Sequence, residues 1–198
     1  MITVIPIIAD IKEFQRGEKP QNALRMDAPR TIDELQKKAT PIAAVLCAVL
    51  FVAVFSKTIT SSTRVVNPLA TAGGVIIGFV LLAVHEWLHA LLYPKDAIVT
   101  IGKVKGKPFF VALVSYPLRR SRFIIMCLLP FVLGVLPLSI FVISPAENLV
   151  LNGLMFGLAS VGMVSPYPDV YNVILILKQA KKKDWIMFYE DDLFRIPG

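Results

Sequence analysis

The chain has 198 residues, of which 56% are hydrophobic, and its mean hydropathy is +0.67. This apolar share lies above the roughly 45–50% of an ordinary soluble domain and argues against a soluble globular protein. The formal net charge of +7 fits either nucleic acid or a membrane surface, so the basic residues must be placed along the chain before either is chosen.

Residues 1–40 are mostly polar and basic, and we expect them to form an N-terminal arm outside the membrane. The pattern TIDE begins at Thr31 and has the form of a capping box, in which a threonine caps a helix and a glutamate reaches back to it. It predicts a short helix that ends before Pro41. No basic region precedes the apolar residues at the start, so a cleaved signal peptide is not expected.

Four segments beyond the arm are apolar enough to span, or nearly span, a bilayer core of about 30 Å, which takes about 20 helical residues. They cover about residues 41–59, 69–93, 122–143 and 148–177. Pro130 and Pro137 are expected to kink the third segment, and the Pro-rich turn SPYPD breaks the fourth. The sequence therefore predicts an all-α polytopic membrane protein with about four transmembrane helices, whose core covers residues 41–180.

Two further segments do not read as spans. Residues 97–118, between the second and third spans, are rich in Val, Ile and Phe with Lys-Gly-Lys-Pro in the middle, which is typical of a β-hairpin. Residues 181–198 carry basic residues, then aromatic residues, then acids, which suits the membrane interface better than a span. We expect one hairpin and one interfacial tail beside the transmembrane helices.

Lysine and arginine are distributed unevenly over the loops. Of the 21 such residues, only Lys57 and Arg64 lie between the first two spans, none lies at 144–147, and the rest lie in the arm, the hairpin region and the tail. Because cytoplasmic loops are enriched in these residues, we expect a multi-pass protein of the cell membrane with both termini and the hairpin in the cytosol. The positive charge then reflects topology and contact with anionic lipid of the bilayer, and nucleic-acid binding is not expected.

The second span contains both histidines of the chain, in the sequence HEWLH. Residues four apart on a helix lie on one face, so His85 and His89 direct their imidazoles at a common point, as two ligands of one tetrahedral zinc require. Glu86 projects about 100° around the helix, close enough to approach a water at the open position of such a zinc. This HExxH pattern predicts metal-assisted hydrolysis with Glu86 as the general base.

Other interpretations of the motif remain open. An ionisable group within a span costs about 2.5–3.5 kcal/mol on insertion scales, so such groups usually face the bundle interior and serve a function. The histidines could instead be bonded to neighbouring helices, or hold a metal that is sensed or transported. A transporter predicts further polar groups along the spans, and the sequence has almost none. Trp87, on the same segment, is expected to pack, to anchor the interface or to line the site.

A catalytic zinc usually has three protein ligands and one water, and the chain has no third histidine. Asp169 is the only acid besides Glu86 that is flanked by spanning segments, and Pro166 and Pro168 break the helix just before it. At 1.5 Å per helical residue, it lies at the same depth as the two histidines. We predict that Asp169 is the third ligand; the alternative is a cap on the second half-helix. Asn172, one turn on, could orient a ligand, bind substrate or bond to a neighbouring helix.

These motifs resemble those of a known class of membrane proteases. The chain resembles intramembrane zinc metalloproteases of the site-2 protease type, and above all the zincin peptidases of the DUF3267 family. The matching parts are HEWLHA at 85–90, the strand-rich segment after it and SPYPD at 165–169, and the resemblance covers about residues 65–180. Site-2 proteases carry N-P-x-P…D-G at the third ligand; here Ser165 replaces the asparagine, the spacing is shorter and Val170 follows the aspartate.

The resemblance implies a zinc ion held by His85, His89 and Asp169, with Glu86 as the base. It also implies that the hairpin, at 97–116, receives an extended substrate peptide by strand pairing. The sequence thus predicts a zinc metalloendopeptidase that cleaves a membrane or juxtamembrane peptide. The alternative is a non-proteolytic membrane scaffold or sensor with a zinc-stabilised core, which would have no need of the base.

Overall fold

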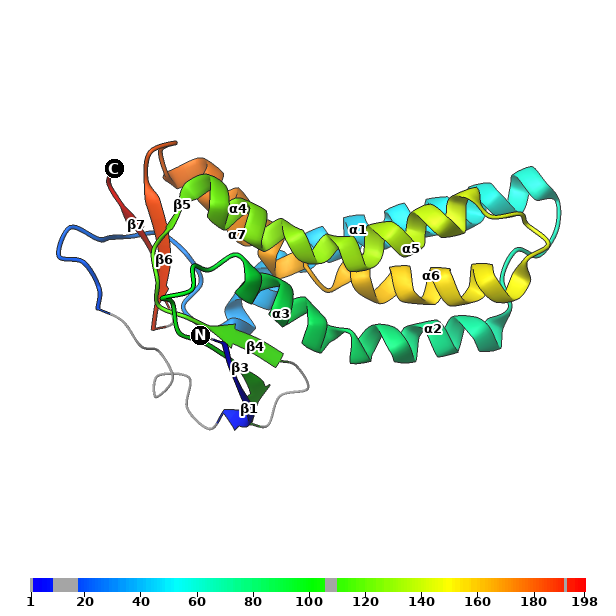
Figure 1. The fold of residues 1–198 in the computed structure, drawn as a ribbon. Coiled ribbons are helices and arrows are strands. Elements are labelled where there is room, and N and C mark those ends of the chain that lie inside the picture. Colours follow the sequence, from blue (N-terminus) through cyan, green and yellow to red (C-terminus); the bar gives the residue numbers. More distant parts are fainter. Residues whose placement is uncertain (1, 9–17, 106–109, 191) are drawn as a thin grey trace. The chain divides into compact units, whose positions relative to one another are not determined.

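The computed structural model of the protein describes residues 2–8, 18–105, 110–190 and 192–198. The described chain is mostly helical and carries two small β-sheets (Figure 1). It divides into two compact units. The first, which contains both sheets, comprises Met1–Ala39, His85–Leu129 and Pro168–Gly198; the second, which is helical, comprises Thr40–Val84 and Pro130–Tyr167.

The helical unit contains most of α1 (Ile32–Ser61), together with α2 (Pro68–Val80), α5 (Val132–Ile143) and α6 (Leu149–Val164). Asn67 caps α2 by accepting a hydrogen bond from the backbone N–H of Ala70. Helices α2 and α6 approach closely at Gly74 and Gly157, where a Cβ on either residue would collide with the backbone of the other helix. Such small residues allow apolar helices to pack in lipid, where no hydrophobic force holds them together.

The apolar helices are long enough to cross a membrane. Three candidate spans are Ile32–Ser61, Arg120–Ile143 and Leu149–Gln179, and the bent pair Pro68–Val80 and Leu82–Leu91 makes a fourth if it counts as one span. The apolar part of α1 is hardly covered by other described residues; Phe51, for example, is 63% exposed. An exposed apolar surface of this length fits a helix that crosses a bilayer.

Three of these spans are interrupted. Helix α2 gives way to α3 (Leu82–Leu91) at Leu81. Helix α4 (Arg120–Leu128) passes into α5 through a 3-10 turn that contains Pro130, and α6 is separated from α7 (Tyr167–Gln179) at Pro166. Proline lacks the N–H that continues a helix, which explains the last two breaks and confirms the interruptions expected there. Pro137 lies within α5 without ending it.

The first unit contains two sheets. In one, β3 (Val99–Val104) pairs in parallel with β1 (Ile2–Ile8) and antiparallel with β4 (Phe110–Leu113). The other is antiparallel, in the order β2 (Leu24–Arg25), β7 (Asp192–Ile196), β6 (Trp185–Tyr189) and β5 (Leu118–Arg119). One buried cluster joins both sheets to α3, α4 and α7 through residues such as Ala90, Val99, Phe123, Ile176 and Ile186. The helices that carry the HExxH motif and Asp169 therefore share a core with the sheets.

The structure corrects the expected start of the first span. Helix α1 runs from Ile32 through Pro41 to Ser61, so no short helix ends before the proline. Pro41 removes one helical hydrogen bond and leaves the carbonyl four residues earlier, at Lys37, without a donor. Lys37 and Pro41 are both exposed, near the polar end of the helix, where water can satisfy that carbonyl.

The β structure is also more extensive than one hairpin. Strands β1 and β2 lie in the segment expected to be an arm, and β6 and β7 lie in the segment expected to be an interfacial tail. Strand β2 pairs with β7, and β5 pairs with β6, across more than 60 residues of sequence. Pairing over such distances leaves no local signature, because each strand is too short for its pattern to identify it.

Candidate metal centre

Helix α3 presents the two histidines on one face. The side chains of His85 and His89 are buried, with exposed fractions of 5% and 8%, whereas Trp87, on the opposite face, is 46% exposed. This is the arrangement that a spacing of four residues predicts for a helix. Trp87 therefore does not line the site, and its place fits a packing or interfacial residue.

Three ligand-type side chains converge at this point. The Nε2 atoms of His85 and His89 are 3.1 Å apart. The carboxylate of Asp169 lies 3.4 Å from Nε2 of His85 and 3.6 Å from Nε2 of His89. The potential ligand atoms of the three residues all lie within 4.8 Å of one another. The structure thus brings together the three residues that the sequence predicts as ligands.

These spacings fit a zinc ion. Two atoms held at about 2.1 Å by one tetrahedral zinc are separated by roughly 3.4 Å. The three measured distances, 3.1, 3.4 and 3.6 Å, lie around that value. Two imidazoles and one carboxylate form a donor set typical of catalytic zinc, which leaves a fourth position for water.

The orientation of His89 is set by a backbone carbonyl. Nδ1 of His89 lies 2.9 Å from the carbonyl oxygen of Met126, on α4. A carbonyl only accepts, so Nδ1 carries a proton, and Nε2 is the ring nitrogen that faces His85 and Asp169 and that would offer its lone pair to a metal. A metal-binding histidine commonly donates its other ring N–H in this way.

Asp169 lies in the first turn of α7, after the break at Pro166. The helix begins two residues earlier, at Tyr167, so Asp169 is not its N-cap residue. Its carboxylate contacts the two imidazoles, which favours the ligand prediction over the alternative of a helix cap. The negative charge is also favourably placed near the N-terminus of a helix.

Glu86 lies beside the three converging residues without joining them. Its Oε1 atom is 4.0 Å from Nε2 of His85, and its side chain is 17% exposed. The carboxylate accepts a hydrogen bond from the backbone N–H of Ala112, in strand β4. A carboxylate next to a metal site, but not part of the ligand set, can take a proton from a bound water.

Strand β4 therefore runs beside the site. Among the described strands it is an edge of its sheet, with β3 on one side only. Ala112, in this strand, presents its N–H to Glu86. Neither this amide nor the carbonyl of Met126 could have been found from the sequence, because a backbone group carries no residue signature.

Asn172, one turn after Asp169, is buried with an exposed fraction of 6%. Within the described part of the chain its amide makes no hydrogen bond. The sequence left open a bond to a neighbouring helix, and none forms among these residues. The amide is not fully enclosed, since the enclosed side-chain polar atoms without a partner in the described residues are Ser115 Oγ and Arg120 Nε.

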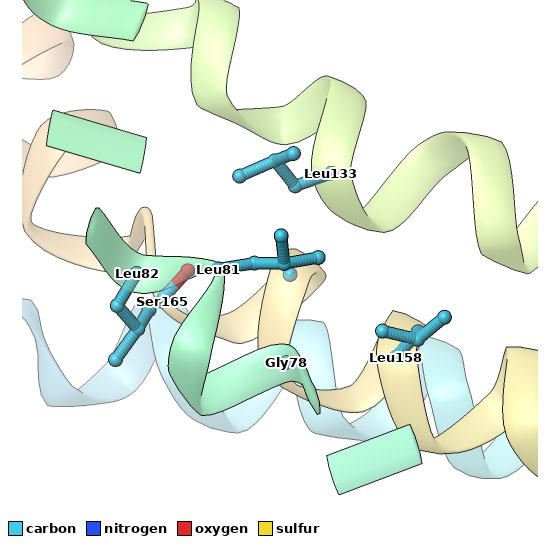
Figure 2. A pocket seen from close by; sticks show the side chains of 7 residues that line it. Gly78, Leu81, Leu82, Leu133, Leu158 and Ser165 are labelled. Carbon is cyan, nitrogen blue, oxygen red and sulfur yellow. The ribbon is translucent and has the colours of Figure 1, made fainter. Parts of the chain in front are cut away.

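A small cavity in the helical unit is separate from these residues. It lies at the break after α2 and is lined by Gly78, Leu81, Leu82, Leu133, Leu158, Gly162 and Ser165. Figure 2 shows leucine side chains around it, with the hydroxyl of Ser165 as the one polar side-chain group. Its volume of about 10 Å³ suffices for about one water molecule, which is too small for a peptide.

Comparison with known proteins gives one match. The DUF3267 family, described as "Putative zincin peptidase", matches residues 78–185, a range that contains the HExxH motif, β3, β4 and Asp169. No curated protein and no solved structure matches the chain.

Proposed function

We propose, from the premise that the chain belongs to the DUF3267 family, that it is a membrane zinc metalloprotease that hydrolyses a peptide bond of a membrane or juxtamembrane substrate. One observation carries the proposal. His85, His89 and Asp169 converge at spacings that fit one zinc ion, and Glu86 lies next to them on an apolar helix. Charged groups are placed within spans at a cost, which favours a functional role.

The residues that would hold the metal are His85, His89 and Asp169. A bound zinc would polarise the scissile carbonyl and lower the pKa of a bound water to about 7. The carbonyl of Met126 holds His89 in the tautomer whose Nε2 is free to bind. Asp169 adds a negative charge, which reduces the net charge of the loaded site.

Glu86 would move the proton. Its carboxylate accepts a proton from the water as the water oxygen forms a bond to the carbonyl carbon. It then gives that proton to the amide nitrogen as the carbon–nitrogen bond breaks, and the products are a carboxylic acid and an amine. The backbone N–H of Ala112 faces this carboxylate and would stabilise its charged form.

The open edge of β4 is the proposed place for the substrate. An extended peptide can add to a free strand edge by backbone hydrogen bonds, which bind it without regard to most of its side chains. Ala112 connects this edge to Glu86 directly, so a peptide paired there would have its backbone close to the base. The amide of Asn172, buried and without a hydrogen bond within the described residues, is a candidate donor to a substrate carbonyl.

The orientation in the membrane is part of the proposal. Lys57, near the end of the first candidate span, and Arg64, in the loop after it, lie on one side, and the other basic residues lie at or beyond the opposite ends of the spans. The positive-inside rule then places both termini and β3–β4 in the cytosol, and the substrate bond in the cytosolic half of the bilayer or next to it.

Glu86→Gln tests the reaction separately from the metal. The amide keeps the shape of the side chain but cannot accept the proton, so we expect hydrolysis to fall by about 10²- to 10⁴-fold while zinc stays bound. New peptide termini in membranes that contain wild-type protein or the variant would identify a substrate. Cleavage of that substrate by purified protein, together with metal content by mass spectrometry, gives the two readouts.

Glu147→Gln, in the loop between α5 and α6, is the matched control and should cleave as wild type does. Hydrolysis that survives Glu86→Gln would rule out this mechanism. Zinc bound at one ion per chain, with no new peptide terminus in any membrane tested, would favour the zinc-stabilised scaffold or sensor.

A further inference from the structure

A group of exposed cations lies where two candidate spans end. Arg119 directly precedes the span Arg120–Ile143, and Lys178 lies in the last turn of the span Leu149–Gln179. The turn after that span adds Lys181, Lys182 and Lys183. These five residues, all exposed, form what we call the basic patch.

The fold of the first unit gathers the patch. Strands β5 and β6 pair with Arg119 opposite Trp185, and the Arg119 guanidinium lies over the Trp185 ring, 5.5 Å from its centroid. The backbone N–H of Arg120 donates to the carbonyl of Asp184, which ties the start of α4 to the lysine turn. Residues far apart in sequence thus share one surface.

The positive charge of the patch is not neutralised. Within the described residues, none of its five cations forms a salt bridge. The one acid in the turn, Asp184, has an exposed side-chain fraction of 3% and is bound by the Arg195 guanidinium at 3.3 Å and by the N–H of Lys181 at 2.9 Å. Burial alone would raise the pKa of Asp184, but these hydrogen bonds hold it below its usual value.

Two further features point to a lipid. Trp185 is 37% exposed beside the patch, and tryptophan is enriched at membrane interfaces, where its ring is apolar and its N–H is polar. The Arg119 guanidinium of the patch lies over this ring, so the interfacial aromatic group and the cation are adjacent.

We propose that the basic patch binds the headgroup of an anionic phospholipid, with Trp185 seated at the membrane interface. Clusters of basic residues next to a span attract anionic lipid electrostatically. The arginine fork suits the phosphate oxygens, and the lysines add charge around it. The site takes a phosphodiester that carries a net negative charge, rather than a zwitterionic headgroup.

Quenching of Trp185 fluorescence tests this directly. The chain has two tryptophans, so Trp87→Phe leaves Trp185 as the only emitter. The full-length protein is placed in lipid nanodiscs in which either phosphatidylglycerol or phosphatidylcholine carries brominated acyl chains, at equal total bromine and equal lipid composition. We expect brominated phosphatidylglycerol to quench at least about twofold more strongly, because two or more lysines enrich the anionic lipid around the ring.

Lys182→Ala with Lys183→Ala should reduce this preference to near equality, while Lys182→Arg with Lys183→Arg should keep it. Lys103→Ala with Lys105→Ala, in β3 and directly after it, removes the same charge elsewhere and should leave the preference unchanged. The preference should also fall at about 1 M salt, where the screening length is about 3 Å.

Three outcomes would overturn the proposal. The first is equal quenching by both lipids in the Trp87→Phe protein. The second is a preference for phosphatidylglycerol that persists when Lys182 and Lys183 are both replaced by alanine. The third is an equal loss of this preference when Lys103 and Lys105 are replaced instead. Inorganic phosphate at 10 mM serves as the soluble competitor. Loss of the preference in its presence would assign the site to free phosphate instead of lipid.

Discussion

Two polar clusters lie within the apolar helices, and they differ in how their hydrogen-bonding groups are matched. In the helical unit, the Lys57 ammonium donates to the backbone carbonyls of Phe141 and Ser144 and to the side-chain oxygen of Asn152. The two carbonyls lie at the C-terminal end of α5, where a helix has carbonyls without donors and a partial negative charge. The three donors of the lysine therefore all find acceptors.

In the other unit, His85 and His89 direct their Nε2 atoms at each other and at the carboxylate of Asp169, and all of these atoms can bind a metal. Nδ1 of His89 already donates to the carbonyl of Met126, so in the neutral ring Nε2 has no proton to give to the group. A cluster with matched donors and acceptors is complete and serves stability. A cluster of converging acceptors is completed by a cation, which is why we assign function to this one and structure to the other.

Removal of Asp169 gives the largest expected effect. Asp169→Ala should weaken zinc binding by at least about 100-fold, because even residues that only support a ligand contribute 10- to 100-fold. Competition with a fluorescent chelator, followed by metal analysis of the purified protein, measures the change. Asp96→Ala, which removes a carboxylate bonded to Tyr116, is the control and should bind zinc normally. Normal zinc affinity in Asp169→Ala would mean that another residue is the third ligand.

Lys57→Met should act on stability alone. It leaves the carbonyls of Phe141 and Ser144 and the buried amide of Asn152 with fewer donors, and we expect a loss of about 1–3 kcal/mol in the free energy of unfolding. Reversible unfolding in mixed detergent micelles measures it, with Lys37→Met, on an exposed turn of the same helix, as the control. Zinc affinity should not change, and a stable variant with altered zinc binding would erase the distinction between the two clusters.

Much of the site could be predicted from the sequence because its signals are local. Two histidines four apart must share a helix face, and two prolines must interrupt a helix close to Asp169. Asp169 follows from its position, because it is the only acid besides Glu86 that is flanked by spanning segments and it lies at the depth of the histidines. The structure brings these side chains together, and their roles as ligands and base stay predictions until metal is measured.

The strands that the sequence did not predict depend on pairing between distant segments. Strand β2 has two residues and is a strand only because it pairs with β7, and β1 pairs with β3 in the same way. Neither strand could therefore be recognised in a segment that is mostly polar and basic. Pro41 led to the opposite error, because a helix was expected to end before it and the helix continues through it. The free-energy cost of a proline inside a helix depends on whether water reaches the freed carbonyl, here that of Lys37. The sequence does not contain that information.

The smallest expected effects come from replacing one asparagine at each cluster, Asn152 beside Lys57 and Asn172 one turn after Asp169, with leucine. Asn152→Leu removes an amide that contacts Lys57 and the carbonyl of Pro145, so it should cost about 1–3 kcal/mol of stability and leave zinc affinity unchanged. Asn172→Leu removes an amide that has no hydrogen bond in the described structure, so stability should be unchanged or slightly higher. If that amide donates to substrate, kcat/KM should fall by about tenfold at normal zinc content, the contribution of one hydrogen bond. A loss of stability in Asn172→Leu as large as that in Asn152→Leu would instead make Asn172 a structural residue, and the acceptor cluster would then end at Asp169.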